Sequence, residues 1–293
     1  MLTQTCQSET GRLEFIFLKS ALSAFASEEN LAAEWKSLNY LAQPVFSEAI
    51  TEYQQFESIF KKMGIDIFHL PFKAMTSADS IYCRDAAIAT DRGMILCNMG
   101  KQARKNEPQA LKQAFEERGI KILGEIRHPG TLEGGDVAWL DEHTLAVGYS
   151  YRTNQEGIDQ LEDLVAPAGI SLVVVPLPHY RGPEDVFHLM SVLSPIDKDL
   201  MLVYSPLLPI SFRNYLLNRQ FQLVEVPDSE IESMGCNVLA LAPRDCLMVS
   251  GNPLTHDRLE KAGCRVQIYS GKEISLKGGG GPTCLTRPVF RER

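Results

Sequence analysis

The chain has 293 residues, 44% of them hydrophobic and 23% charged, which is ordinary for a globular protein with a sizeable core. Its formal net charge of −8 argues against a broad nucleic-acid surface and is compatible with a small cationic ligand. No apolar run approaches the roughly 18 residues needed to cross a membrane, and residues 1–15 lack the pattern of a signal peptide.

Four segments share one pattern, in which an apolar strand, a polar turn and a second apolar strand form a predicted β-hairpin. They begin at Arg84, Gly135, His188 and Asn237. Apolar residues at helical spacing predict helices over 46–63, 107–119, 154–169 and 252–263, and a short apolar strand follows each. The repeating unit is therefore strand–strand–helix–strand, with a period of about 50 residues.

The segment RLEFIFLK, which begins at Arg12, is expected to pair with CLTRPVF, which begins at Cys284. This pairing would close five units into a ring. We therefore predict an α/β fold, a five-bladed ββαβ propeller with a pseudo-fivefold repeat, built as a single domain over residues 1–293. An ordinary α/β domain whose hairpins recur by chance is the alternative.

A polar residue stands at the head of the first strand of each unit. These residues are Asp85, Asp136, His188, Asn237 and Cys284. A ring would gather them around one central cavity, where a thiol, an imidazole and carboxylates form a nucleophile and acid–base set. Neighbouring carboxylates raise the pKa of a thiol unless the substrate brings positive charge, as a guanidinium does.

Each of these residues, taken alone, also has a purely structural explanation. Asp85 and Asp136 are suited to cap turns, and His188 to a satisfied position in the core. Cys284 is one of seven scattered cysteines without a CxxC pair or zinc spacing, which is typical of reduced thiols in a cytoplasmic protein. The four glycines before it suit a flexible linker, but also allow close approach of the backbone to a ligand.

Several motifs resemble the guanidino-group-modifying enzymes of the pentein superfamily, which include dimethylarginine dimethylaminohydrolase, arginine deiminase and amidinotransferases. The matching segments, spread over nearly the whole chain, are SETGRLEFIFLK, DSIYCRDAAIA, LEGGDVAWL, VGYSYRTNQEG, FHLMS and GGGGPTCLTRP. The resemblance implies a five-bladed propeller, in agreement with the repeat. It also implies that Cys284 is the nucleophile, that His188 is the general acid and base, and that Glu133 orients His188.

The same resemblance assigns substrate-binding roles. Asp85 and Asp136 would hold the guanidinium, and Asp79 is a further acidic position of dimethylarginine hydrolases. Arg152 of YRTNQEG, and by a weaker match Arg104 of QARKNE, would bind the substrate carboxylate.

The residue at the position of Met190 differs between members of the superfamily. Arginine deiminases and amidinotransferases resemble each other in carrying an aspartate two residues after the histidine, whereas this chain has Met190. An apolar side chain there tolerates an alkyl group, so we expect hydrolysis of N-methylated arginine to citrulline and an alkylamine. The glycine run, in contrast, resembles that of the deiminases.

The expected partner is thus a small cationic guanidino substrate, without a metal or organic cofactor, nucleic acid or membrane. Arginine deiminase, another substituted-guanidine hydrolase and amidinotransferase remain alternatives, and so does a pentein-fold binding factor without catalysis. A homodimer is also left open.

Overall fold

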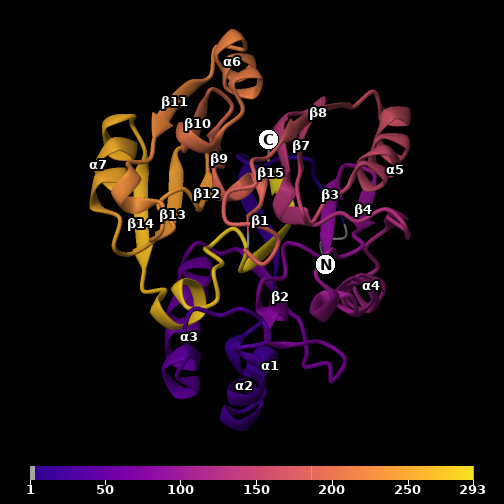
Figure 1. The fold of residues 1–293 in the computed structure, drawn as a ribbon, viewed down its shortest axis with the longest axis vertical. Coiled ribbons are helices and arrows are strands. Elements are labelled where there is room, and N and C mark those ends of the chain that lie inside the picture. Colours follow the sequence, from indigo (N-terminus) through magenta and orange to yellow (C-terminus); the bar gives the residue numbers. More distant parts are fainter. Residues whose placement is uncertain (1–3, 186, 293) are drawn as a thin grey trace.

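A computed structural model describes residues 4–185 and 187–292. Within these residues, five three-stranded sheets are arranged around a common centre, with the main helices on the outside (Figure 1). The predicted α/β propeller with a fivefold repeat is therefore confirmed. No helix of the described part is long and apolar enough to span a bilayer.

Each sheet has the same topology, because its first strand pairs antiparallel with its second, and the third pairs parallel with the second. The five sheets consist of β15 (Thr286–Glu292), β1 (Arg12–Leu18) and β2 (Asp66–His69); β3 (Ala87–Thr90), β4 (Gly93–Leu96) and β5 (Ile122–Glu125); β6 (Val137–Asp141), β7 (Thr144–Tyr149) and β8 (Ser171–Pro176); β9 (Leu193–Asp197), β10 (Leu200–Val203) and β11 (Gln222–Glu225); and β12 (Val238–Ala242), β13 (Asp245–Val249) and β14 (Arg265–Tyr269).

One helix links the second and third strand of each sheet. These helices are α3 (Phe46–Lys62), α4 (Glu107–Glu117), α5 (Gln155–Val165), α6 (Ile210–Asn218) and α7 (Pro253–Lys261); the short α1 (Ala21–Phe25) and α2 (Glu28–Glu34) precede α3. The four predicted helices are confirmed, with ends shifted by a few residues. Helix α6 was not predicted, because it leaves Ile210 and Leu217 exposed and buries only Phe212 and Leu216, so its apolar spacing is weak.

Burial falls from the centre of the ring outward. Every residue of the inner strand β3 and of the middle strand β4 is buried, whereas every residue of the outer strand β5 is partly exposed. Neighbouring sheets meet through their inner strands, such as β9 and β12. The strand ends that surround the centre are therefore held by packing on all sides, which is what a precise side-chain constellation requires.

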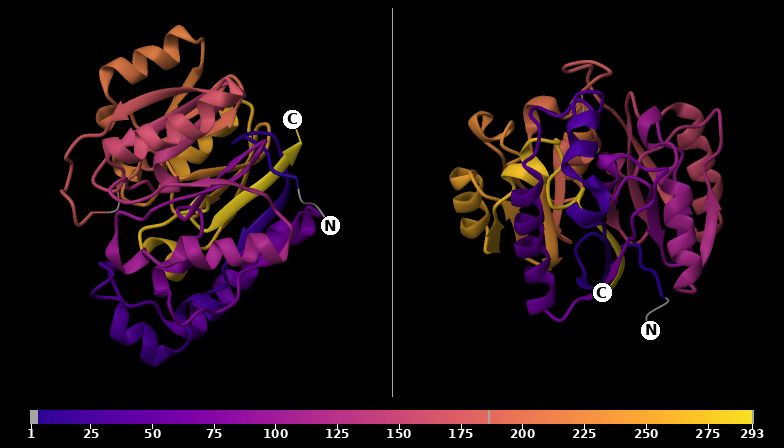
Figure 2. Two further views of the ribbon diagram at one scale, coloured as in Figure 1. Left: turned by 90° about the vertical axis from the view of Figure 1, so that its right-hand side faces the viewer. Right: turned by 90° about the horizontal axis from the view of Figure 1, so that it is seen from below.

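The ring is closed by the first and last strands of the described chain. Strand β1 pairs antiparallel with β15, with Leu18 opposite Thr286 and Leu13 opposite Arg291. Figure 2 shows the yellow β15 beside the indigo β1. The predicted closure is confirmed, and it brings Cys284, two residues before β15, to the same end of the ring as the other strand heads.

Candidate active site

Side chains from all five sheets converge at one end of the ring. Asp85 precedes β3, Glu133 precedes β6, His188 precedes β9, Asn237 precedes β12 and Cys284 precedes β15. Two cavities meet here, and His188 and Cys284 line both of them. We call the one that Phe187, Met190 and Ile231 help to line the wide cavity, and the one that Lys101, Arg104 and Arg152 help to line the basic cavity.

His188 and Glu133 form a buried pair. The Nε2 atom of His188 lies 2.9 Å from Oε2 of Glu133, and both residues are almost fully buried. The backbone N–H of Lys101 donates to the other oxygen of Glu133 at 3.0 Å. Gly135 packs so closely that a Cβ there would lie 2.5 Å from Nδ1 of His188, so only glycine leaves room for the ring.

The protonation of this pair follows from its surroundings. Burial alone lowers the pKa of His188, but the negative charges of Asp136 and Asp85 and the hydrogen bond to Glu133 outweigh it and raise the pKa to about 9. Burial raises the pKa of Glu133, yet the hydrogen bond from His188 and the charge of Arg152 hold it well below its usual range. The pair is therefore imidazolium and carboxylate at neutral pH.

Asp85 presents one bound and one open oxygen. Its Oδ2 accepts a hydrogen bond from Nη1 of Arg104 at 2.5 Å. Its Oδ1 is buried and has no hydrogen-bond partner among the described residues. Polar atoms of Asp85, Glu133 and His188 all lie within 4.8 Å of one another, a spacing that also suits a metal ion. Because His188 is protonated on Glu133, the set suits a cation that brings its own N–H donors better than a bare ion.

Cys284 differs from the other cysteines. Among the described residues, the remaining six cysteines are buried, whereas Cys284 is partly exposed and lines the cavities. Burial of the sulfur and the charge of Asp85 raise the pKa of the Cys284 thiol, while a hydrogen bond from Asn237 lowers it. No hydrogen bond joins Cys284 to His188 in the described part of the chain, so the histidine does not hold the thiol proton.

The glycine run packs tightly against neighbouring side chains. A Cβ at Gly280 would lie 2.4 Å from the ring of Tyr82, and one at Gly281 would lie 2.4 Å from Oδ1 of Asn237. Gly278 and Gly279 line both cavities. Apart from Gly279, which has open space beside it, the run is therefore a close-packed wall that places the thiol, and the flexible-linker interpretation does not fit it.

The structure does not support the prediction that Asp136 holds the guanidinium. Asp136 is fully buried and lines neither cavity. Its oxygens accept hydrogen bonds from Oγ of Ser150 at 2.6 Å, from Oγ1 of Thr153 at 2.7 Å and from the N–H of Leu189 at 2.9 Å. Asp136 therefore fixes the turn after His188, and of the two carboxylates predicted to hold the guanidinium only Asp85 lines a cavity.

Arg104 also differs from its predicted role of binding a substrate carboxylate. Its Nε and Nη2 donate to the two oxygens of Glu107 at 2.9 and 2.8 Å, Nη2 donates to the carbonyl of Tyr82, and Nη1 donates to Asp85. Four hydrogen bonds to groups of the protein leave little capacity for an anion. Arg104 therefore positions Asp85.

The other predicted substrate-binding residues line the site. Arg152 lines the basic cavity and lies 3.3 Å from Oε2 of Glu133. Asp79 lines the same cavity and pairs with Nζ of Lys101 at 2.7 Å. Met190 is buried in the turn after His188 and lines the wide cavity. Their contacts with a substrate remain predictions.

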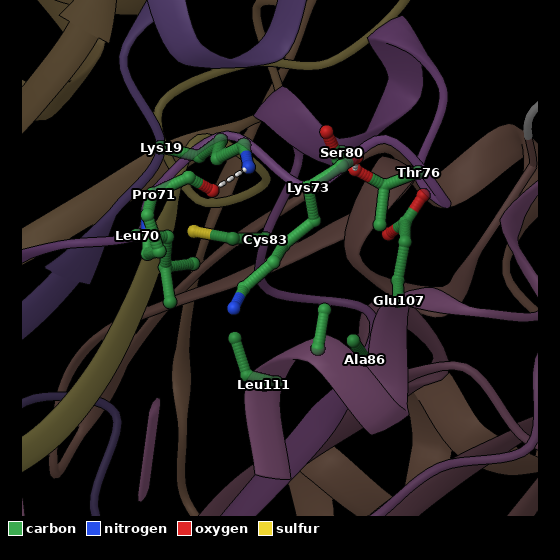
Figure 3. Close-up of a pocket in the computed structure, with 11 residues that line it drawn as sticks. Lys19, Leu70, Pro71, Lys73, Thr76, Ser80, Cys83, Ala86, Glu107 and Leu111 are labelled. Atoms are coloured by element: carbon green, nitrogen blue, oxygen red, sulfur yellow. Dashed lines mark hydrogen bonds between the residues drawn. The ribbon is translucent and has the colours of Figure 1, made fainter. Parts of the chain in front are cut away.

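A third cavity is lined in part by Glu107 and Leu111 of α4 (Figure 3). Lys19, Cys83 and Glu107 line it, and Nζ of Lys19 donates to the carbonyl of Pro71. Burial lowers the pKa of Lys19 to about 8 and raises the pKa of Glu107 to about 7. Glu107 accepts two hydrogen bonds from Arg104, and Arg104 in turn donates to Asp85. Residues that line this cavity therefore support the position of Asp85.

Asn237 has a contact that sequence reasoning did not assign. The repeat predicts it only as a strand head, yet its Nδ2 lies 3.4 Å from Sγ of Cys284. The repeat was the signal that could have found it, because the other four strand heads belong to or adjoin the cluster.

Comparisons with known proteins agree with this geometry. The family model for N,N dimethylarginine dimethylhydrolase, eukaryotic, matches residues 23–291. The N(G),N(G)-dimethylarginine dimethylaminohydrolase of Pseudomonas aeruginosa is 25% identical over 85% of this chain and 91% of its own length. An arginine deiminase of Oenococcus oeni is 25% identical over 76% of this chain but only 63% of its own length.

Solved structures show the same fold. The Pseudomonas aeruginosa enzyme in complex with citrulline aligns with a TM-score of 0.76 at 22% identity, covering 95% of this chain and 100% of its own. The N-terminal domain of ArgZ, a cyanobacterial arginine dihydrolase, aligns with a TM-score of 0.79 at 18% identity, covering 95% and 98%.

Proposed function

Because the chain belongs to the N,N dimethylarginine dimethylhydrolase family, and is thus a hydrolase of carbon–nitrogen bonds in amidines, we propose that it hydrolyses N-methylated arginine to citrulline and an alkylamine. The reaction passes through a covalent S-alkylthiouronium on Cys284.

The observation that carries the proposal is the open Oδ1 of Asp85. A buried carboxylate oxygen without a donor costs free energy unless a ligand supplies one. Beside it lie a thiol and a protonated imidazole, and Arg104 fixes the other oxygen. A guanidinium is planar, always cationic and rich in N–H donors, so it matches this acceptor.

The first chemical step is attack by the thiolate. The bound guanidinium offsets the negative charge of Asp85, which lowers the pKa of the Cys284 thiol toward thiolate. The sulfur attacks the central carbon of the guanidinium and forms a tetrahedral intermediate. His188 donates a proton to the departing nitrogen, because an amine leaves far more readily than an amide anion.

The second step is hydrolysis of the adduct. After the amine leaves, His188 is neutral and accepts a proton from water, which attacks the same carbon. The carbon–sulfur bond breaks and the thiolate and the ureido product are released. Glu133 stabilises the imidazolium at both stages and keeps the ring in place through the bond at Nε2.

The wide cavity supports an N-substituted substrate. Six apolar side chains contribute to its lining: Leu41, Phe187, Met190, Leu207, Ile231 and Met234. An alkyl group on the guanidinium gains burial there and removes an N–H donor that would otherwise need an acceptor. The matches to arginine deiminases favour free arginine as the second candidate.

A panel assay separates these candidates. It measures ureido product and released amine from arginine, monomethylarginine, asymmetric dimethylarginine and agmatine. Cys284→Ser should lose essentially all turnover with an unchanged fold, and rapid quench of the wild type should trap the adduct on Cys284. Turnover of arginine that equals or exceeds that of the methylated forms would overturn the methylarginine proposal. An adduct on another cysteine would overturn the mechanism.

A further inference from the structure

Asn237 faces the nucleophile with its amide nitrogen. Its Nδ2 lies 3.4 Å from Sγ of Cys284, while its Oδ1 accepts from the backbone N–H of Thr283 at 3.1 Å and from the Thr283 hydroxyl at 2.9 Å. A backbone N–H can only donate, so the amide oxygen must face Thr283. The NH₂ group is therefore fixed toward the sulfur.

Three features hold this amide in place. Asn237 is only 7% exposed, and its backbone N–H donates to the carbonyl of Met234 at 3.0 Å. A side chain at Gly281 would collide with the amide, since its Cβ would lie 2.5 Å from Cγ of Asn237. The amide is thus held between β12 and the turn before β15.

The thiolate has few other donors. The Thr283 hydroxyl lies 3.8 Å from the sulfur, but its single proton already goes to Oδ1 of Asn237. The His188 ring is bonded to Glu133 through Nε2. Among the side chains that the structure describes, the Asn237 amide is the remaining neutral donor aimed at the sulfur.

We infer that Asn237 is a catalytic residue, which stabilises the thiolate of Cys284 by donating an N–H to the sulfur and holds the sulfur toward the substrate carbon. A neutral donor suits this position, because a positively charged side chain beside the sulfur would repel the cationic guanidinium of the substrate. The inference rests on the proposed role of Cys284 as nucleophile and adds the group that prepares it in the free enzyme.

The test uses alkylation of the free enzyme, so it does not depend on the natural substrate. Iodoacetamide reacts with the thiolate, and peptide mass spectrometry follows its attachment to Cys284 as a function of pH. Asn237→Ala should raise the pKa of the Cys284 thiol by about one and slow alkylation at pH 7 about tenfold. Asn237→Asp, which is isosteric and keeps the acceptor for Thr283, should raise the pKa further because it adds negative charge.

Asn252→Ala is the matched control. Asn252 is a similarly buried asparagine of the same repeat, where it is the N-cap residue of α7, and its amide donates to the carbonyls of Ser233 and Val249. This variant should lower stability without moving the pH profile of alkylation. If Asn237→Ala fails to fold, the alkylation profile of Asn237→Asp tests the inference in its place. An unchanged alkylation profile in a folded Asn237 variant would overturn the inference, even if the guanidine hydrolase assignment stands.

Discussion

Nε2 of His188 lies 2.9 Å from Oε2 of Glu133, and no hydrogen bond links the ring to Cys284 in the described structure. The raised pKa of His188 keeps the ring charged before substrate binds, and in the proposed mechanism it acts as an acid first. This differs from a thiol–imidazole pair, in which the histidine withdraws the proton of the nucleophile. In the proposed mechanism the substrate cation and Asn237 assist ionisation of the thiol, and His188 keeps its proton for the leaving amine.

Glu133→Gln should slow turnover about tenfold, because it removes the charge that keeps His188 protonated but leaves an acceptor of similar shape. His188→Ala should slow turnover ~10²–10⁴-fold, since it removes the proton donor itself. Single-turnover kinetics with quench and mass spectrometry measure both effects. The descending pH limb of Glu133→Gln should also move to lower pH. Retention of more than about a tenth of the wild-type rate by His188→Ala would contradict its acid–base role.

The kcat/KM should rise by about tenfold or more between pH 7 and pH 9. Below its raised pKa, the Cys284 thiol gains up to about tenfold in thiolate fraction per pH unit, while His188 remains largely protonated until about pH 9. Initial rates in buffers of constant ionic strength measure this. A flat profile from pH 6 to pH 8 would mean that the thiol is already ionised in the free enzyme.

Met190→Asp should shift substrate preference from methylated arginine toward free arginine. A carboxylate at the wide cavity would accept a hydrogen bond from an unsubstituted guanidinium nitrogen, which favours arginine. A methyl group in its place would desolvate the carboxylate, which disfavours methylated arginine. Each effect is worth roughly 1–3 kcal/mol. The ratio of the two kcat/KM values measures the shift. Met190→Leu, which keeps the apolar surface, is the control and should leave the ratio nearly unchanged. Equal ratios in the Asp and Leu variants would show that Met190 does not face the guanidinium.

Lys19→Met should stabilise the protein by about 1–2 kcal/mol at pH 7, because it removes a buried ammonium whose only hydrogen bond among the described residues is to the carbonyl of Pro71. The folded pKa of about 8 lies below the unfolded value of 10.5, so the penalty is complete below pH 8 and disappears as the pH rises toward 10.5. Denaturant unfolding at pH 7 and pH 10 measures this. The exposed Lys198→Met is the control, and a gain that does not shrink with pH would contradict burial as the cause.

The repeat made most of the fold predictable. Apolar strands, polar turns and helical spacing recur with one period, so the pattern predicted the hairpins, four helices and the pairing of β1 with β15. Helix α6 escaped because two of its large apolar residues, Ile210 and Leu217, face solvent. Strand heads were predictable as a group, because a ring places equivalent positions of each unit together.

The hydrogen-bond partners inside the site were less predictable. Asp136 and Asp85 look alike as acidic strand heads, yet Ser150 and Thr153 occupy Asp136 while Asp85 keeps an open oxygen. That difference depends on the path of the loop after β7, which no local pattern encodes. Arg104 and Glu107, three residues apart, were a local signal for an internal ion pair, but their contact with Asp85 arises only from the tertiary fold.

Closure of the ring by β1 and β15 has a consequence for assembly. The two strands lie far apart along the chain, so their pairing is a long-range event and slow compared with formation of the hairpins within each sheet. Until it occurs, His188 and Asp85 can be in place while the sulfur of Cys284 is not. If Cys284 is the nucleophile as proposed, a partly assembled ring is inactive toward guanidines, and the return of activity during refolding reports when β1 and β15 pair.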